Sequence, residues 1–114
     1  MPESYEIDQS NSIVTCRFTE REVTHLGMQE AIDDCMIHCR NYNAQNFVFD
    51  MGEVEFLASA CIGVLVTFLQ EIEPMRCRMA MANCRENVAF LFKVTQLDEV
   101  FHLHEDVAEA VASF

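Results

Sequence analysis

Short runs of β-branched and aromatic residues alternate along this chain with longer segments whose apolar residues recur at helical spacing. Ile13–Phe18 is rich in β-formers between polar flanks, and residues 46–51 are a short apolar run after a polar loop, so both are predicted strands. Further strands are predicted at residues 5–7, 76–82 and 99–104. Helices are predicted at residues 24–42, 59–73, 85–94 and 106–114. Thr24 is the expected N-cap of the first helix, and Pro74 closes the second.

The resulting order, β-β-α-β-α-β-α-β-α, is typical of an α/β domain whose later strands are largely parallel. The chain has 114 residues, of which 51% are hydrophobic, with three glycines, two prolines and no low-complexity tract. We therefore expect one domain over residues 1–114.

The charge of the chain excludes some classes of partner. Nineteen acidic residues against seven Lys and Arg give a formal charge of −12, which argues against binding nucleic acid or an anionic membrane surface. The first residues show no export signal, and the longest uncharged stretch, residues 56–69, is too short for a membrane helix. We expect a cytoplasmic protein without membrane insertion.

The predicted helix at residues 59–73 has one small and polar side. On a helical wheel Ser59, Gly63, Thr67 and Gln70 share this side, while the other positions form an apolar arc that packs on the sheet. Ser59 at the helix start has two interpretations. It is a structural N-cap, or it is a phosphoacceptor whose phosphate would lie at the positive end of the helix dipole and repel a partner docked on the exposed side.

The passage from Asn46 through the start of this helix resembles the STAS domain, the fold of bacterial anti-sigma factor antagonists. In that family an apolar strand ending in Asp leads to Phe-(Met/Leu/Ile)-Asp-Ser-(Ser/Ala/Thr)-Gly-Leu-Gly. Asn46–Asp50 looks like the strand, and Phe56-Leu57, Ser59 and Ile62-Gly63 match the motif. Residues 88–92 and 97–101 look like the family's third helix and the approach to its last strand.

The resemblance implies a STAS-like α/β fold, with a four- to five-stranded mixed sheet and about four helices mostly on one side. It implies a protein-interaction module of bacterial signalling, without enzyme activity or cofactor, that binds an anti-sigma factor acting as a serine kinase. Ser59 is then the phosphoacceptor that regulates transcription through this complex. Whether the domain forms a homodimer is left open by the sequence. The expected partner-binding residues are Glu55, Leu57, Ala58, Ala60, Gly63, Thr67 and Gln70.

Three positions depart from the family pattern. The motif's Asp before the serine is Ala58, its Gly two positions after the serine is Cys61, and an Asp expected after the second strand falls at or near Glu22 or Val23. In the family both acids lie near the phosphoserine, and Glu53 and Glu55 are the candidates to replace them. The alternative function is a constitutive STAS scaffold or adaptor, without a phosphorylation switch.

Cysteine and histidine residues supply the remaining alternatives. Without an export signal, the six cysteines are expected to be free thiols within apolar segments. Cys35, His38 and Cys39 form a Cys-x-x-His-Cys cluster. We interpret its cysteines as small residues on the inner face of a helix. The alternatives are a metal site and a small thiol- or metal-dependent enzyme. His102 and His104 are expected to share a face of an exposed strand end, with too few ligands for a metal.

Overall fold

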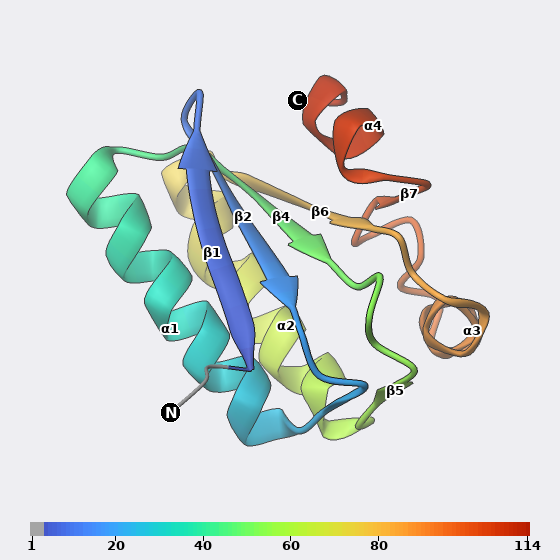
Figure 1. Cartoon of the computed structure of the whole chain (residues 1–114). Coiled ribbons are helices and arrows are strands. Elements are labelled where there is room, and N and C mark those ends of the chain that lie inside the picture. Colours follow the sequence, from blue (N-terminus) through green and yellow to red (C-terminus); the bar gives the residue numbers. More distant parts are fainter. Residues whose placement is uncertain (1–3) are drawn as a thin grey trace.

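Residues 4–114 form a five-stranded mixed sheet with four α-helices, which is the framework of the fold (Figure 1). The computed structural model describes residues 4–114, apart from the side chain of Tyr42. Residues 1–3, on which the expectation of no export signal partly depends, lie outside the described residues. In chain order the elements are β1 (Tyr5–Ser10), β2 (Ile13–Phe18), β3 (Glu22–Val23), α1 (His25–Tyr42), β4 (Asn46–Asp50), β5 (Phe56–Leu57), α2 (Ala60–Ile72), the 3₁₀ turn η1 (Glu73–Met75), β6 (Arg78–Ala82), α3 (Glu86–Val94), β7 (Leu103–His104) and α4 (Val107–Ala112).

The sheet has the strand order β1-β2-β4-β6-β7. β1 and β2 pair antiparallel through a tight hairpin, in which Asn11 and Ser12 adopt positive φ values of 52° and 66°. Two positive values at a two-residue loop match the twist of the flanking strands. The other neighbours pair in parallel, which requires the crossovers that the helices provide. The α/β prediction is confirmed.

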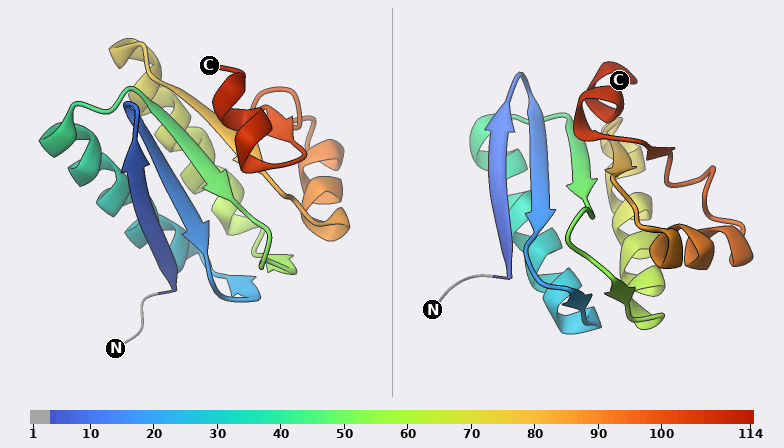
Figure 2. Two further views of the ribbon diagram at one scale, coloured as in Figure 1. Left: turned by 45° about the horizontal axis from the view of Figure 1, so that its top comes forward. Right: turned by 45° about the vertical axis from the view of Figure 1, so that its right-hand side comes forward.

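Helices cover the two faces of the sheet unequally. On the α1 and α2 side, Phe68 of α2 makes edge-to-face contacts with Phe47 and Phe49 of β4, at ring-centroid distances of 5.0 and 5.8 Å. Val48, one position between those two strand residues, points to the opposite face and joins a smaller cluster with Ala110 of α4. Figure 2 shows α4 across the sheet from α1 and α2. This alternation is the period-two pattern of a strand that is buried on both faces.

Several predicted boundaries differ from the structure. β1 extends to Ser10, β6 begins only at Arg78, and the last strand shrinks to Leu103–His104, because residues 98–102 form turns. His102 lies in one of those turns with a φ of 54°, so it does not share a strand face with His104, whose Nδ1 lies 3.1 Å from Glu109 Oε1. The sequence prediction also missed β3 and β5, which pair with each other in a separate two-stranded sheet.

Candidate functional site

The candidate site is the loop from the end of β4 to the start of α2. This loop lies at the carboxyl edge of the parallel strands, where ligands of open α/β sheets usually bind. Asp50 closes its first turn, since Oδ1 accepts hydrogen bonds from Gly52 N and Asn83 Nδ2, both at 3.0 Å. A Cβ at Gly52 would lie 3.3 Å from that same oxygen. The turn therefore links the ends of β4 and β6 and favours glycine.

The second half of the loop is held by β3. Arg21 O accepts hydrogen bonds from Glu55 N and Phe56 N, at 2.7 and 2.9 Å, and Val23 O accepts one from Ala58 N at 3.1 Å. Glu22 pairs with Phe56, and Val23 pairs with Leu57, in parallel register. Residues that are distant in sequence thus fix the backbone immediately before Ser59.

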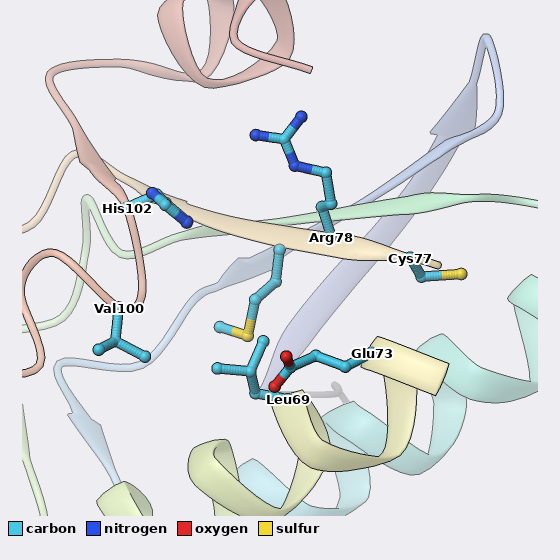
Figure 3. Close-up of a pocket in the computed structure, with 7 residues that line it drawn as sticks. Leu69, Glu73, Cys77, Arg78, Val100 and His102 are labelled. Carbon is cyan, nitrogen blue, oxygen red and sulfur yellow. The ribbon is translucent and has the colours of Figure 1, made fainter. Parts of the chain in front are cut away.

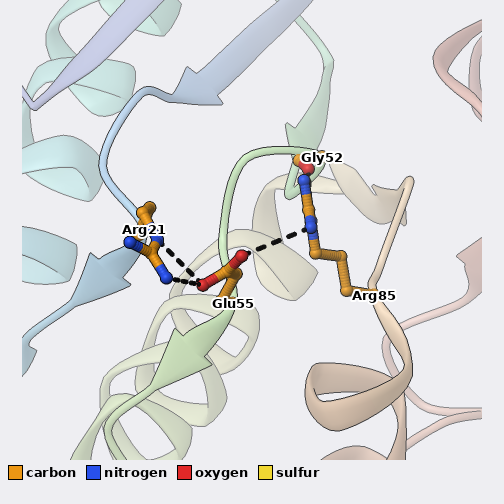
Figure 4. A network of polar contacts seen from close by, with 4 residues as sticks. All are labelled: Arg21, Gly52, Glu55 and Arg85. Atoms are coloured by element: carbon orange, nitrogen blue, oxygen red, sulfur yellow. Dashed lines mark hydrogen bonds and ion pairs between the residues drawn. The ribbon is translucent and has the colours of Figure 1, made fainter.

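Glu55 is the centre of an ion-pair network that ties the loop to α3 (Figure 4). Its Oε2 accepts from Arg21 Nε at 2.8 Å and Nη2 at 2.5 Å, and its Oε1 lies 3.6 Å from Arg85 Nη1. Arg85 Nε also donates to Gly52 O at 2.8 Å. Both carboxylate oxygens of Glu55 are therefore paired with guanidinium groups, and Glu55 offers no free acidic group in place of the missing family Asp residues.

Ser59 is exposed, and its side chain makes no capping hydrogen bond. Its backbone is already helical, with φ −60° and ψ −28°, whereas an N-cap residue normally has extended values. Ala58 O and Ser59 O accept the first bonds, from Cys61 N at 2.9 Å and Ile62 N at 3.1 Å. The interpretation of Ser59 as a side-chain N-cap is wrong. β3 holds the preceding turn so that the helical backbone conformation already begins at Ser59, one residue before α2.

The helical wheel predicted the exposed side of α2 correctly. Ala60, Gly63, Thr67 and Gln70 are all exposed, and a Cβ at Gly63 would meet no atom within 4 Å. The opposite side of α2 buries Cys61, Leu65, Phe68 and Ile72. Glu55, Leu57 and Ala58 of the preceding loop are partly buried. We call the predicted partner residues together with Ser59 the α2 face: Glu55, Leu57, Ala58, Ser59, Ala60, Gly63, Thr67 and Gln70.

An apolar groove beside this loop was missed by the sequence analysis. It has a volume of about 350 Å³ between β5 and α3. Phe56, Phe90 and Val94 line it and expose 56%, 64% and 57% of their surface. Glu55 and Leu57 line the groove as well, so it is continuous with the α2 face. Exposed aromatic residues on one surface mark interaction sites more often than scattered apolar residues do.

Of the two family Asp positions, the one before the serine holds Ala58, and the other falls at or near Glu22 or Val23. Val23 is buried, at 4% exposure, and packs in the main core, while Ala58 also packs against that core. The Val23 O to Ala58 N bond brings these two positions together, directly before Ser59. Glu22 and Glu53 are exposed nearby in sequence. An acid directly before Ser59 is therefore missing, whereas Glu22 is an acidic residue at or next to the second family position.

The three side chains of the Cys-x-x-His-Cys cluster in α1 each contact a different group of the protein. Cys35 is fully buried, and its hydrogen bond with the Cys16 thiol, together with burial, raises the pKa of Cys35. His38 Nδ1 lies 3.0 Å from Asp34 O, and Cys39 Sγ donates to Ala44 O at 3.1 Å. Among residues 4–114, no three His, Cys, Asp or Glu side chains are placed to hold a metal ion.

The STAS domain family matches residues 6–110, and the chain belongs to that family. A putative anti-sigma factor antagonist from Thermotoga maritima is 18% identical and superimposes with a TM-score of 0.77, over 96% of this chain and 92% of that one. An anti-sigma factor antagonist from Mycobacterium paratuberculosis is 16% identical, with a TM-score of 0.77 over 99% and 96% of the two chains.

The Bacillus cell fate determinant SpoIIAA in its phosphorylated form is 13% identical, with a TM-score of 0.71 over 96% of both chains. At these identities the likeness establishes the shared fold. The protein is thus a STAS domain with structural similarity to anti-sigma factor antagonists. None of the helices described for residues 4–114 is long and apolar enough to cross a membrane.

Proposed function

We propose that this STAS domain is a non-catalytic, cytoplasmic interaction module of bacterial signalling. It binds an anti-sigma factor that is also a serine kinase, through the α2 face, and phosphorylation of Ser59 releases that partner. The observation that carries the proposal is the state of Ser59. Its hydroxyl is exposed at the start of the α2 face and has no capping role in the fold. A modification there can change the surface without disturbing the helix.

The physical basis of release is charge placed inside a contact. A phosphate adds about two negative charges at neutral pH. The first donors of α2, Cys61 N and Ile62 N, already bond to the carbonyls of Ala58 and Ser59, so they do not neutralise it fully. A partner packed over small residues such as Ala60 and Gly63 would have to bury this charge, which costs several kcal/mol when it is unpaired.

The groove between β5 and α3 enlarges the proposed contact surface. Phe56 and Phe90 are the kind of exposed aromatic residues that dominate the energetics of many interfaces. Phe90→Ser is expected to weaken partner binding at least tenfold and to leave the fold unchanged, because the ring is 64% exposed. Leu26→Ser on α1, where the side chain is 68% exposed, is the matched control and should retain binding.

The test uses purified ATP-dependent anti-sigma factor kinases encoded in the same genome. Each is incubated with ATP and with wild type, Ser59→Ala or Ser59→Asp, and binding and intact mass are measured. We expect one phosphate on wild type and none on Ser59→Ala, which still binds, whereas Ser59→Asp binds at least tenfold more weakly. Ser10→Asp adds the same charge at the opposite end of the sheet, beside the start of β2, and should bind like wild type.

A constitutive adaptor is the second candidate function. The partly buried Ala58 favours it, because no carboxylate lies directly before Ser59, and the side chain of Val23 is buried as well. The same experiment separates the two functions. A kinase that binds but leaves no phosphate, with Ser59→Asp binding as tightly as wild type, refutes the switch and supports the adaptor.

A further inference from the structure

All six cysteines are free thiols, and four of them form two neighbouring pairs. Cys35 of α1 interacts with Cys16 of β2, and both are completely buried. Cys39, one turn further along α1, interacts with Cys77, the residue before β6. The second pair lies near the end of α1 and directly before the start of β6, at the end of the molecule away from Ser59.

The backbone accounts for the proximity of Cys39 and Cys77. Cys39 Sγ donates to Ala44 O at 3.1 Å, which holds it beside the segment that enters β4. β4 and β6 pair in parallel with Asn46 opposite Arg78, and Arg78 N also donates to Asn46 Oδ1 at 3.1 Å. Extending this register by one residue places Cys77 beside the residue that follows Ala44. Cys39, hydrogen-bonded to the carbonyl of Ala44, and Cys77, opposite Gln45, therefore both lie at the start of β4.

The side-chain directions agree with this placement. Side chains alternate along β6, so Cys77 points to the same face as Met79, which packs in the main core beneath α1 and α2. Arg78 points to the other face, where its guanidinium carbon lies 5.7 Å from the centroid of the Phe114 ring. Figure 3 shows Arg78 and Cys77 leaving the strand in different directions. Cys39 lies on the buried side of α1, one turn after Cys35.

Solvent access distinguishes the two pairs. Cys16 and Cys35 are 0% exposed, whereas Cys77 is 8% exposed and Cys39 is only partly buried. An oxidant in solution therefore reaches Cys39 first, and Cys77 is the adjacent second thiol. Redox-sensitive cysteines are accessible to solvent and often lie next to a second cysteine that can resolve the oxidised form.

We propose that Cys39 and Cys77 form an oxidative modification site that a peroxide converts to a disulfide. The Cys39 thiolate attacks one peroxide oxygen and the O–O bond breaks, which yields a sulfenic acid and hydroxide. The Cys77 sulfur then attacks the sulfenic sulfur, the S–O bond breaks, and a second hydroxide leaves. With the two thiol protons, the products are one disulfide and two waters, so two thiols are oxidised and one peroxide is reduced.

The disulfide would join the end of α1 to the start of β6 and leave the α2 face unchanged. The rate has a predictable pH dependence. Burial and the neighbouring Cys39 thiol raise the pKa of Cys77. Since the thiolate is the nucleophile, closure of the disulfide accelerates as the pH rises.

The experiment treats the full chain with hydrogen peroxide, alkylates the remaining thiols in denaturant with iodoacetamide, and maps peptides without reduction. We expect the loss of two hydrogen atoms from the intact mass, four alkylated thiols, and a crosslinked peptide pair containing Cys39 and Cys77. Dithiothreitol should reverse the change. Cys39→Ser and Cys77→Ser should each abolish the crosslink, and Cys39→Ala serves if a serine variant does not fold.

Cys84→Ser is the matched control, because Cys84 is also partly buried but lies after β6, away from the pair. It should retain the crosslink. The proposal is overturned if Cys39 proceeds to sulfinic acid while Cys77 remains alkylatable, if Cys16 and Cys35 crosslink instead, or if all six thiols stay reduced. Because the pair lies at the end of the molecule away from Ser59, none of these outcomes bears on the proposed partner switch.

Discussion

Two helix starts in this protein make contrasting predictions about stability. Thr24 precedes α1 with an extended backbone, and its side-chain oxygen accepts a hydrogen bond from Gly27 N at 3.1 Å. Ser59 precedes α2 with a helical backbone and no such bond. Removing a capping hydroxyl costs about 1 kcal/mol, so Thr24→Ala should destabilise the protein by about that amount.

Ser59→Ala should change the free energy of unfolding by no more than about 0.5 kcal/mol. No hydrogen bond of the cap is lost, and alanine at a position that is already helical is the better helix former. In urea titrations, a slope of about 1.5 kcal/mol per M converts the Thr24→Ala loss into a midpoint shift of about 0.7 M. Ser59→Ala should leave the midpoint within about 0.3 M of wild type.

Equal losses in the two variants would refute the argument. They would mean that the Ser59 hydroxyl caps α2 in solution, and the serine would then have a structural role that phosphorylation must disrupt. A loss in Thr24→Ala alone would leave the Ser59 hydroxyl available for regulation, as the proposed function requires. Circular dichroism of both variants checks that their helical content is unchanged before the midpoints are compared.

Three further predictions test the core, the loop network and the thiols. Phe68→Ala should cost about 3–5 kcal/mol in urea unfolding, because the buried ring contacts two other rings and its loss leaves a cavity. Glu55→Gln should cost at most about 1 kcal/mol, because the side chain of its partner Arg21 is 77% exposed, and the difference from wild type should shrink in high salt. Burial raises the pKa of the Cys61 thiol from 9.0 to about 11. The folded state therefore holds this proton more tightly than the unfolded chain, so stability should be full below pH 9.0 and decline as the pH rises to about 11, with a smaller decline in Cys61→Ala.

Much of the fold was predictable because its elements have clear local patterns. The run at Ile13–Phe18 was predicted with its observed boundaries, and the capping role of Thr24 was also predicted correctly. The wheel for α2 separated its exposed and buried sides because one helix side packs on the sheet along its whole length. By contrast, β3 and β5 have two residues each, too few for any period to appear, and they exist through pairing with each other.

The site shows the same division. Its position at the start of α2 followed from the spacing of Ser59 and Gly63 and from the preceding apolar strand. That spacing does not reveal the backbone angles of Ser59, because these depend on Val23 O holding Ala58 N from a distant part of the chain. In the sequence, Glu55 was a candidate to replace a missing family acid. In the structure its carboxylate forms ion pairs with Arg21 and Arg85.

The sequence alone therefore determined the order of the helices and of the strands in the larger sheet, the buried side of each long helix, and the motif that places the chain near a known family. These properties depend on the periodicity and the residue types within one segment, so they can be recognised without knowing the rest of the fold. Only the tertiary structure decided that the Ser59 hydroxyl caps nothing, that Phe56 and Phe90 line one groove, and that Cys39 interacts with Cys77. Each of these depends on contacts between residues far apart in the chain, which form only when the sheet assembles and brings its helices together.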